Sequence, residues 1–134
     1  MGENNFPGFK SKFDGHSTSE EVLRDVDLNG KRYIVTGAST GLGFYSAKMI
    51  AAKGGKVTIT ARSTDRAEKT IASLLNELGP DSTADAFDYL VMDQLDLAQV
   101  KSAAEVFLSR NCPLDGLLLN AGWFGSEYKL SGMV

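Results

Sequence analysis

The sequence predicts an α/β fold, a doubly wound parallel β-sheet with helices on both faces. Short apolar runs alternate along the chain with longer segments whose apolar residues recur at helical spacing. A glycine-rich stretch directly follows the first apolar run. Strands that alternate with helices imply right-handed crossovers, and such crossovers place the strands parallel. The length of 134 residues fits one domain.

The first third of the chain is expected to contain an arm, a short helix, a strand and a longer helix. Residues 1–16 form the arm, and Thr18 with Glu21 makes a capping box that begins the short helix. The run YIVT at 33–36 is short and apolar, so it predicts a buried strand. The next helix ends at KGG, residues 53–55. Its predicted buried face consists of Leu42, Ser46, Met49 and Ile50.

The rest of the chain predicts three further strands and two further helices. The strands are KVTITA at 56–61, FDYLVM at 87–92 and LLLN at 117–120. The first of these helices ends at Gly79–Pro80, and a polar loop follows it. Its apolar stripe is Ala67, Ile71, Leu74, Leu75 and Leu78. The stripe of the second helix is Val100, Ala103, Ala104, Phe107 and Leu108.

Composition excludes several classes of protein. The net charge of -3 gives no electrostatic footprint for nucleic acid. No apolar run approaches the roughly 20 residues of a membrane span, and the amino-terminal residues hold no apolar signal segment. The single cysteine, Cys112, cannot form an internal disulfide, which fits a reducing compartment. We therefore expect a cytoplasmic protein without a metal site.

The glycine-rich stretch indicates a nucleotide site. Gly37, Gly41 and Gly43 lie between a predicted strand and a predicted helix. In dinucleotide-binding turns the first glycine permits a tight turn, the second lets the backbone approach a pyrophosphate, and the third lets the helix pack on the strand. The alternative is a glycine turn that only reverses the chain. A P-loop is excluded, because no Gly-Lys-Ser/Thr follows.

Three motifs in this order resemble the short-chain dehydrogenase/reductase family. They are TGASTGLG at 36–43, LDLAQV at 95–100 and LLLNAG at 117–122. The segment 17–44 also resembles the retinol-dehydrogenase-like and WW-domain-oxidoreductase-like members. The resemblance covers residues 18–134. It implies an incomplete Rossmann-type sheet of about four strands in the order 3-2-1-4, with an arm at 1–29 and a partial dinucleotide-binding domain at 30–134.

The resemblance also implies a set of cofactor-binding residues. The residues expected around the phosphates and ribose are Gly37, Ser39, Thr40, Gly41, Leu42 and Gly43. Asp96 and Leu97 are expected to touch the adenine, and Asn120, Ala121 and Gly122 to line the nicotinamide side. Asp96 has an alternative role, because with Gln99 it forms a D-x-x-Q capping box. Asn120 has a structural alternative, since in the family this asparagine helps to tie the central strands together.

The end of the second strand bears on the choice of nicotinamide cofactor. An acidic residue there would bind the ribose 2′-hydroxyl of NAD, but this sequence has Ala61 followed by Arg62. An arginine at this position resembles the NADP-preferring members, because a guanidinium makes charge-assisted bonds to a 2′-phosphate. We therefore expect NADP rather than NAD. Arg62 could instead be a solvated cation, and Ala61 also disfavours an S-adenosylmethionine site.

The family's catalytic pattern, Y-x-x-x-K, is not found in residues 1–134. Lys129 directly follows Tyr128, and Gly132 stands four positions after it, so both are expected to be surface loop residues. His16 is expected to be solvated in the arm. The resemblance implies that this polypeptide alone does not transfer hydride. The alternative is a non-catalytic nucleotide-binding or interaction module. The unpaired apolar edge of the fourth strand predicts self-association.

Overall fold

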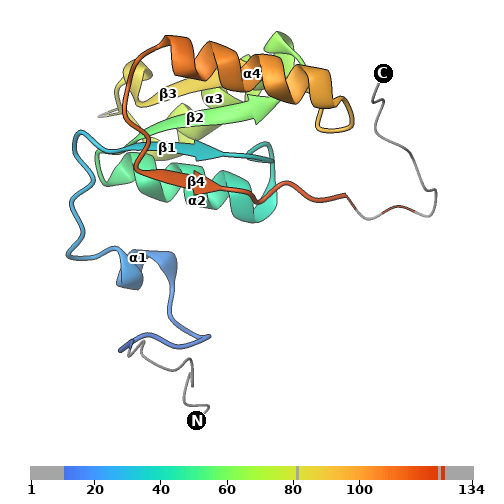
Figure 1. Ribbon diagram of the computed structural model, residues 1–134. Helices are drawn as coiled ribbons and strands as arrows, with labels where there is room; N and C mark the ends of the chain where they lie inside the picture. The colour runs from blue at the N-terminus through green and yellow to red at the C-terminus, as the bar shows by residue number, and fades with distance from the viewer. Residues whose placement is uncertain (1–10, 81, 124, 126–134) are drawn as a thin grey trace.

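The chain folds into one four-stranded parallel sheet with the strand order β3-β2-β1-β4 (Figure 1). The computed structural model describes residues 11–80, 82–123 and 125. The strands are β1 (Arg32–Val35), β2 (Lys56–Ala61), β3 (Phe87–Val91) and β4 (Gly116–Leu118). The predicted strand order is confirmed.

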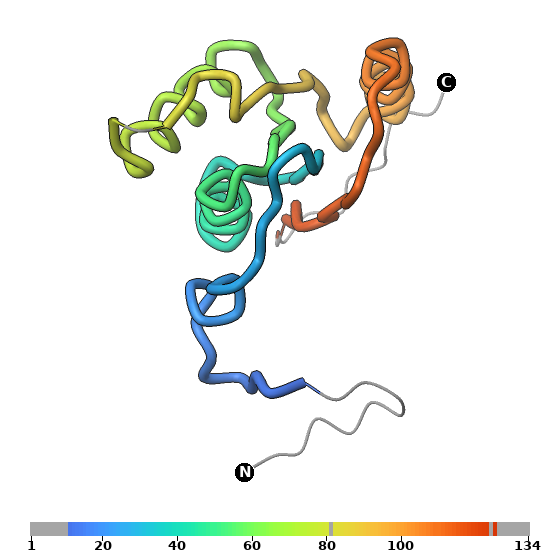
Figure 2. Tube along the Cα trace, turned by 90° about the vertical axis from the view of Figure 1, so that its left-hand side faces the viewer, coloured from blue at the N-terminus to red at the C-terminus, as the bar shows by residue number. Residues whose placement is uncertain are grey.

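Helices cover both faces of the sheet, as predicted. The main helices are α2 (Gly41–Ala52), α3 (Thr64–Leu78) and α4 (Leu97–Ser109). α2 and α3 lie on one face and α4 lies on the other (Figure 2). The reason is topological: β1, β2 and β3 follow one another outward, whereas β4 returns to the far side of β1, and a right-handed crossover in the reverse direction places its helix on the opposite face.

The core is divided between these two faces. The larger cluster joins β1 and β2 to α2 and α3, and its fully buried large side chains are Val35, Val57, Ile59 and Leu74. The smaller cluster joins β1 and β3 to α4 through Ile34, Leu90, Ala103 and Phe107. Three consecutive β2 residues, Val57 to Ile59, are buried because helices cover both sides of the strand.

The predicted start of α1 (Ser19–Val22) and the predicted end of α3 are confirmed. A capping box starts α1: the Glu21 backbone N–H donates to Thr18 Oγ1 at 3.2 Å, and the Thr18 N–H donates to Glu21 Oε2 at 2.9 Å. Gly79 ends α3 with φ +88°. The polar loop before β3 contains a short 3-10 helix, η1 (Ala84–Ala86), which the sequence did not indicate.

Two predicted helix faces are partly wrong. In α2, Leu42 is 81% exposed, and the buried positions are Gly43, Ala47, Met49 and Ile50. In α4, Ala103 and Phe107 are buried, whereas Ala104 and Leu108 are exposed. Each apolar set spans more of the helix circumference than one sheet face can cover. The helix therefore buries only the part of its stripe that meets the sheet.

The fourth strand begins and ends earlier than LLLN predicts. β4 pairs with β1 from Gly116 to Leu118, and the Tyr33 ring lies over Gly116, where an added Cβ would come within 2.6 Å of it. Beyond Leu118, side-chain hydrogen bonds replace the regular ladder. Within the described residues, no helix is long and apolar enough to cross a bilayer.

Candidate functional site

The predicted site residues come from segments that meet at one edge of the sheet. Because all four strands are parallel, their carboxyl ends lie together. The turn between β1 and α2 lies at this edge beside the chain that leaves β4 (Figure 1). β1 is also the strand from which the crossovers diverge, since β2 and β4 flank it. In open α/β sheets, ligands bind at such a topological switch point.

The three glycines of the turn have different surroundings. Gly37 has φ +69°, and a Cβ added there would come within 2.8 Å of the Ala121 Cα. Gly43 abuts the Gly37 carbonyl and the Asn120 amide, so its close contact is with the turn and with Asn120 rather than with the strand. Gly41 has φ +60° and open space where a side chain would be. Two glycines therefore serve packing, and Gly41 leaves room for a ligand.

The start of α2 differs from the starts of the other helices. Thr40 is its N-cap residue but makes no side-chain capping hydrogen bond. Side chains cap the other three α-helices of the described chain: those of Thr18, Ser63 and Asp96. The first N–H groups of a helix have no partner within the helix, and together with the helix dipole they attract anions. Among the described residues, the first N–H groups of α2 thus meet no side-chain cap, and they lie beside the open space at Gly41.

A hydrogen-bonded network fixes the chain after β4 against the glycine turn. Asn120 Nδ2 donates to the carbonyls of Thr36 at 3.0 Å and Gly37 at 3.2 Å. The Ala121 N–H donates to Thr36 Oγ1 at 3.0 Å, and that hydroxyl donates to the Leu118 carbonyl at 3.4 Å. Thr36 is only 3% exposed. Asn120 thus ties β1 to β4, which is the structural role that was its alternative to cofactor binding.

Thr36 is a residue of this site that the sequence reasoning missed. The glycines of the motif that begins with Thr36 indicate a nucleotide site, whereas Thr36 itself falls at the end of the predicted strand YIVT. A hydroxyl residue directly before the first glycine was the available signal. Its partner Ala121 is 85 positions away in the sequence, so no local pattern could identify the bond.

Asp96 is occupied as a helix cap. Its Oδ1 accepts the N–H groups of Ala98 at 2.9 Å and Gln99 at 3.2 Å, and its Oδ2 accepts Gln99 Nε2 at 3.0 Å. The hydrogen bond from the Gln99 backbone is the main reason that the pKa of Asp96 lies below its ordinary value. Gln99 Oε1 in turn accepts the Asp93 N–H at 3.0 Å. Leu97 follows the cap and is exposed at the start of α4.

Arg62 lies at the same edge, directly after β2. It is exposed, and it precedes Ser63, whose hydroxyl accepts the Arg66 N–H at 3.4 Å to begin α3. Within the described part of the chain, no carboxylate lies within salt-bridge distance of the Arg62 guanidinium. The acidic residue of the first α3 turn, Asp65, is instead paired with Lys69 at 2.9 Å.

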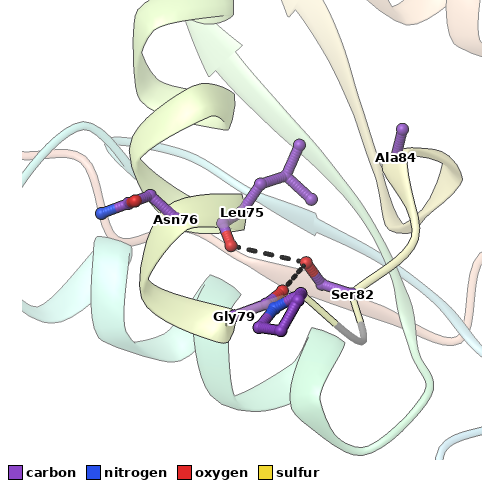
Figure 3. A pocket seen from close by; sticks show the side chains of 6 residues that line it. Leu75, Asn76, Gly79, Ser82 and Ala84 are labelled. Carbon is purple, nitrogen blue, oxygen red and sulfur yellow. Dashed lines mark hydrogen bonds between the residues drawn. The ribbon is translucent and has the colours of Figure 1, made fainter.

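Two hollows lie away from this edge. One of about 430 Å³ is formed where α3 ends (Figure 3), and Ser82 there donates a 2.6 Å hydrogen bond to the Gly79 carbonyl. The other, of about 790 Å³, lies between the ends of α2 and α3 and the loop before β1. Both are at the amino-terminal edge of the strands. Neither contains a predicted site residue.

The remaining predicted residues fall into two groups. Ser39, Thr40 and Gly122 are exposed, at the glycine turn and beyond β4. Tyr128 and Lys129 lie outside the described residues. Among the residues that are described, no group of three His, Cys, Asp or Glu side chains is placed to hold a metal ion.

Sequence comparisons agree with the motifs. The family model described as short chain dehydrogenase matches residues 31–132. The WW domain-containing oxidoreductase of Gallus gallus is 36% identical over 125 residues, which are 93% of this chain and 29% of that protein. The short-chain dehydrogenase/reductase drtF of Aspergillus calidoustus is 41% identical over 105 residues, 78% of this chain and 32% of that protein. The chain thus spans about a third of the length of these relatives.

Solved structures show the same arrangement of elements. L-Sorbose reductase from Gluconobacter frateurii, complexed with NADPH and L-sorbose, matches with a TM-score of 0.62 and 27% identity, over 78% of this chain and 38% of that chain. Menthone neomenthol reductase from Mentha piperita matches with a TM-score of 0.62 and 31% identity, over 69% of this chain and 32% of that chain.

Proposed function

The chain belongs to the short-chain dehydrogenase/reductase family, and on that premise we propose that its glycine turn binds a nicotinamide dinucleotide, with NADP(H) preferred over NAD(H). The observation that carries the proposal is the α2 amino terminus, which no side chain of the described residues caps and which adjoins the open space at Gly41. A pyrophosphate at this position would accept the N–H groups that the chain leaves unused.

The other parts of the dinucleotide are assigned by position along the edge. Ser39, Thr40 and Leu42 flank the phosphates. Asp96 and Leu97 border the adenine, with Asp96 holding α4 in place through its cap. Asn120, Ala121 and Gly122 border the nicotinamide ribose, and the Thr36 network fixes the first two of them. The structural neighbour from Gluconobacter frateurii, which is complexed with NADPH, supports a nicotinamide cofactor in this fold.

The preference for NADP(H) rests on Arg62. Ala61 leaves the end of β2 without a carboxylate that would repel a 2′-phosphate. The Arg62 guanidinium is exposed there and has no ion-pair partner among the described residues. It can therefore make charge-assisted hydrogen bonds to the phosphate without first breaking a salt bridge.

The chemistry assigned to these residues is binding and orientation. A bound nicotinamide supplies the hydride acceptor or donor. The turn and the α2 amino terminus hold the phosphates, and the pinned segment at 120–122 sets where the nicotinamide end lies. The proton donor that a carbonyl reduction requires is not assigned to any of residues 1–134, because they contain no Y-x-x-x-K.

Calorimetric titration with NADPH tests this function directly. The folded protein, checked by circular dichroism, is expected to bind NADPH and not to bind S-adenosylmethionine, the nucleotide ligand that Ala61 disfavours. A folded protein that binds S-adenosylmethionine instead, or that binds neither compound, would contradict the proposal.

A second function, an interaction module, is favoured by the outer edge of β4. Within the described residues β4 pairs only with β1, and Leu119 just beyond it is 77% exposed. Unpaired strand edges with apolar side chains promote association. We propose that this edge drives self-association.

Sedimentation velocity of the parent protein and of the Leu119→Lys variant tests whether the β4 edge drives self-association. The lysine is expected to abolish concentration-dependent association, whereas Leu108→Lys, a change at an exposed α4 position, is expected to preserve it. Equal association of all three proteins would show that the β4 edge does not drive self-association.

A further inference from the structure

The outer edge of β3 is occupied by side chains of the chain itself. β3 is the last strand on the side of the sheet away from β4 (Figure 1), and within the described residues it pairs only with β2. The segment 86–92, AFDYLVM, contains a single charged residue, Asp88. A short apolar segment at a sheet edge is a template on which a second chain can add a strand. The backbone groups on the outer side of β3 therefore decide whether this edge is open.

Tyr89 carries the outward-facing backbone groups in the middle of β3. The Met92 N–H, just after the strand, donates to the Ala61 carbonyl of β2 at 2.8 Å. Successive residues of a strand direct their N–H and C=O groups to opposite edges, so Leu90 also faces β2 and Tyr89 faces outward. A strand that added to β3 would therefore need the N–H and the carbonyl of Tyr89 as hydrogen-bonding partners.

Both of these Tyr89 groups are already hydrogen-bonded to side chains. The Tyr89 N–H donates to Asp88 Oδ1 at 2.6 Å, and Arg110 Nη2 donates to the Tyr89 carbonyl at 3.2 Å. Arg110 Nη1 pairs with Asp88 Oδ2, so one guanidinium joins the carboxylate to the carbonyl. We call Asp88 and Arg110 the edge clasp. An incoming strand would have to break both hydrogen bonds and separate this ion pair before its own backbone could pair.

The end of α4 holds the guanidinium of the edge clasp in place. Arg110 is the C-cap residue of α4, and its Cζ lies 5.9 Å from the centre of the Phe107 ring. Phe107 is itself buried in the cluster between α4 and the sheet. A guanidinium presents its N–H groups in a rigid fork, which suits simultaneous contact with two acceptors. The helix thus positions Arg110 to bond the carboxylate and the carbonyl together.

We infer that the edge clasp is an autoinhibitory contact that closes the β3 edge against strand addition by a second copy of this chain. It occupies both main-chain groups that a neighbouring strand would need, and it places an ion pair on an otherwise apolar strand. The inference is independent of cofactor binding. It gives the two outer strands opposite behaviour, because the β3 edge is closed whereas the β4 edge carries the self-association proposed above.

Amide hydrogen exchange, followed by NMR in dilute protein, tests the clasp at Tyr89. Asp88→Ala is expected to raise the exchange rate of the Tyr89 amide relative to that of Leu90 by about tenfold, the change that corresponds to one lost charge-assisted hydrogen bond. The inward-facing Leu90 amide is the internal reference for any change in global stability. Asp85→Ala removes a carboxylate from another exposed ion pair, that with Lys56 at 2.9 Å, and is expected to keep the parent ratio. An unchanged ratio in folded Asp88→Ala would overturn the inference.

Sedimentation velocity tests the consequence for association, in a Leu119→Lys background that is expected to silence the β4 edge. Adding Asp88→Ala or Arg110→Ala is expected to produce concentration-dependent association, whereas adding Asp85→Ala is not. Because β3 itself would form the contact, the Tyr89 amide of the Asp88→Ala protein is expected to exchange more slowly as the concentration rises. Clasp variants that sediment like the Asp85→Ala control would contradict the inference. Association without slower exchange at Tyr89 would place the contact elsewhere and would contradict it as well.

Discussion

At the scale of single residues, the glycine turn shows that the same residue type can serve different purposes. Gly37 and Gly43 are required by neighbours, because a Cβ on either would strike Ala121 or the Asn120 amide. Gly41 is required by its backbone, since φ +60° disfavours other residues, and among the described residues no atom lies within 4 Å of an added Cβ. Ligand binding and folding should therefore respond differently to changes at Gly41 and Gly43.

Gly41→Val is expected to abolish NADPH binding while reducing stability less than Gly43→Val. Its side chain would enter the open space assigned to the pyrophosphate, at a strain of about 1–2 kcal/mol for the left-handed backbone. Gly43→Val would overpack the turn, at about 1–3 kcal/mol or more. Urea unfolding measures the stabilities and calorimetry measures the binding.

Gly30→Val is the matched control for this comparison. Gly30 has φ +75° and equally open surroundings, but it precedes β1 at the other edge of the sheet. The Gly30→Val protein is expected to lose as much free energy of unfolding as Gly41→Val and to keep its affinity for NADPH. Normal NADPH binding by a folded Gly41→Val protein would show that the pyrophosphate does not bind beside Gly41.

Arg62→Asp is expected to reverse or abolish the preference for NADP(H). Loss of a charge-assisted contact costs about 1.5–3 kcal/mol, or roughly 10- to 100-fold in affinity. Arg24→Asp makes the same charge change at an exposed position of the amino-terminal region and is expected to leave both affinities unchanged. Calorimetry with NADPH and NADH measures the preference, and equal affinities in the parent protein would refute the role of Arg62.

At the scale of elements, polar side chains at the strand ends hold the sheet in register. Asp115 precedes β4 and accepts the Arg32 N–H at 2.9 Å and Lys31 Nζ at 3.0 Å. The Asp115 N–H donates to the Arg32 carbonyl at 2.8 Å. At the same amino-terminal edge of the strands, Arg110 at the end of α4 pairs with Asp88 and donates to the Tyr89 carbonyl at 3.2 Å, which attaches α4 to β3. The Asp115 contacts with Arg32 extend the short β1–β4 ladder beyond its first residue pair, Tyr33 and Gly116.

The Asp115 contacts predict a pH dependence of stability. The hydrogen bond from the Arg32 backbone, followed by that from Lys31, lowers the pKa of Asp115 below its ordinary value of 3.8. A carboxyl whose folded-state pKa is depressed stabilises the fold above the ordinary pKa and loses this contribution as the pH falls through the folded-state value. The free energy of unfolding in urea is therefore expected to decrease below that ordinary value.

Asp115→Asn isolates this contribution. The amide oxygen can still accept the Arg32 N–H but does not titrate in this range, so the decrease with acid is expected to become shallower than in the parent. Asp25→Asn, a change at an exposed residue after α1, is the control and should keep the parent slope. Identical slopes for the parent and Asp115→Asn would show that protonation of Asp115 does not contribute to the loss of stability in acid.

At the scale of the whole molecule, we expect this polypeptide to bind cofactor without transferring hydride. General acid–base catalysis contributes about 10²–10⁴-fold, and none of residues 1–134 forms the family's Tyr-Lys pair. NADPH oxidation, followed by the absorbance of reduced nicotinamide with aldehydes, ketones and quinones, is expected to stay at the rate without protein. Turnover that disappears in Tyr128→Phe would identify a catalytic tyrosine that works without its usual lysine.

The order and type of the main elements could be predicted from the sequence alone, because they depend on local chemistry: apolar periodicity distinguishes strands from helices, and Thr18 and Gly79 mark helix ends through their own hydrogen bonds or backbone angles. The strand order followed from the resemblance to the family. The motifs of the turn and of LLLNAG are contiguous, so they can be recognised without a structure. The roles of Arg62 and of the other cofactor-binding residues remain predictions.

Tertiary packing sets which apolar residues are buried, where β4 ends and which side chains meet at the edge. Leu42 and Leu108 have helical spacing that fits burial, yet they are exposed, because spacing defines a helix face but not the width of the surface that covers it. Thr36 and Ala121 are far apart in the chain and are joined only when β4 pairs with β1. Contacts of that kind depend on the closing of long loops, and no local pattern of residues encodes them.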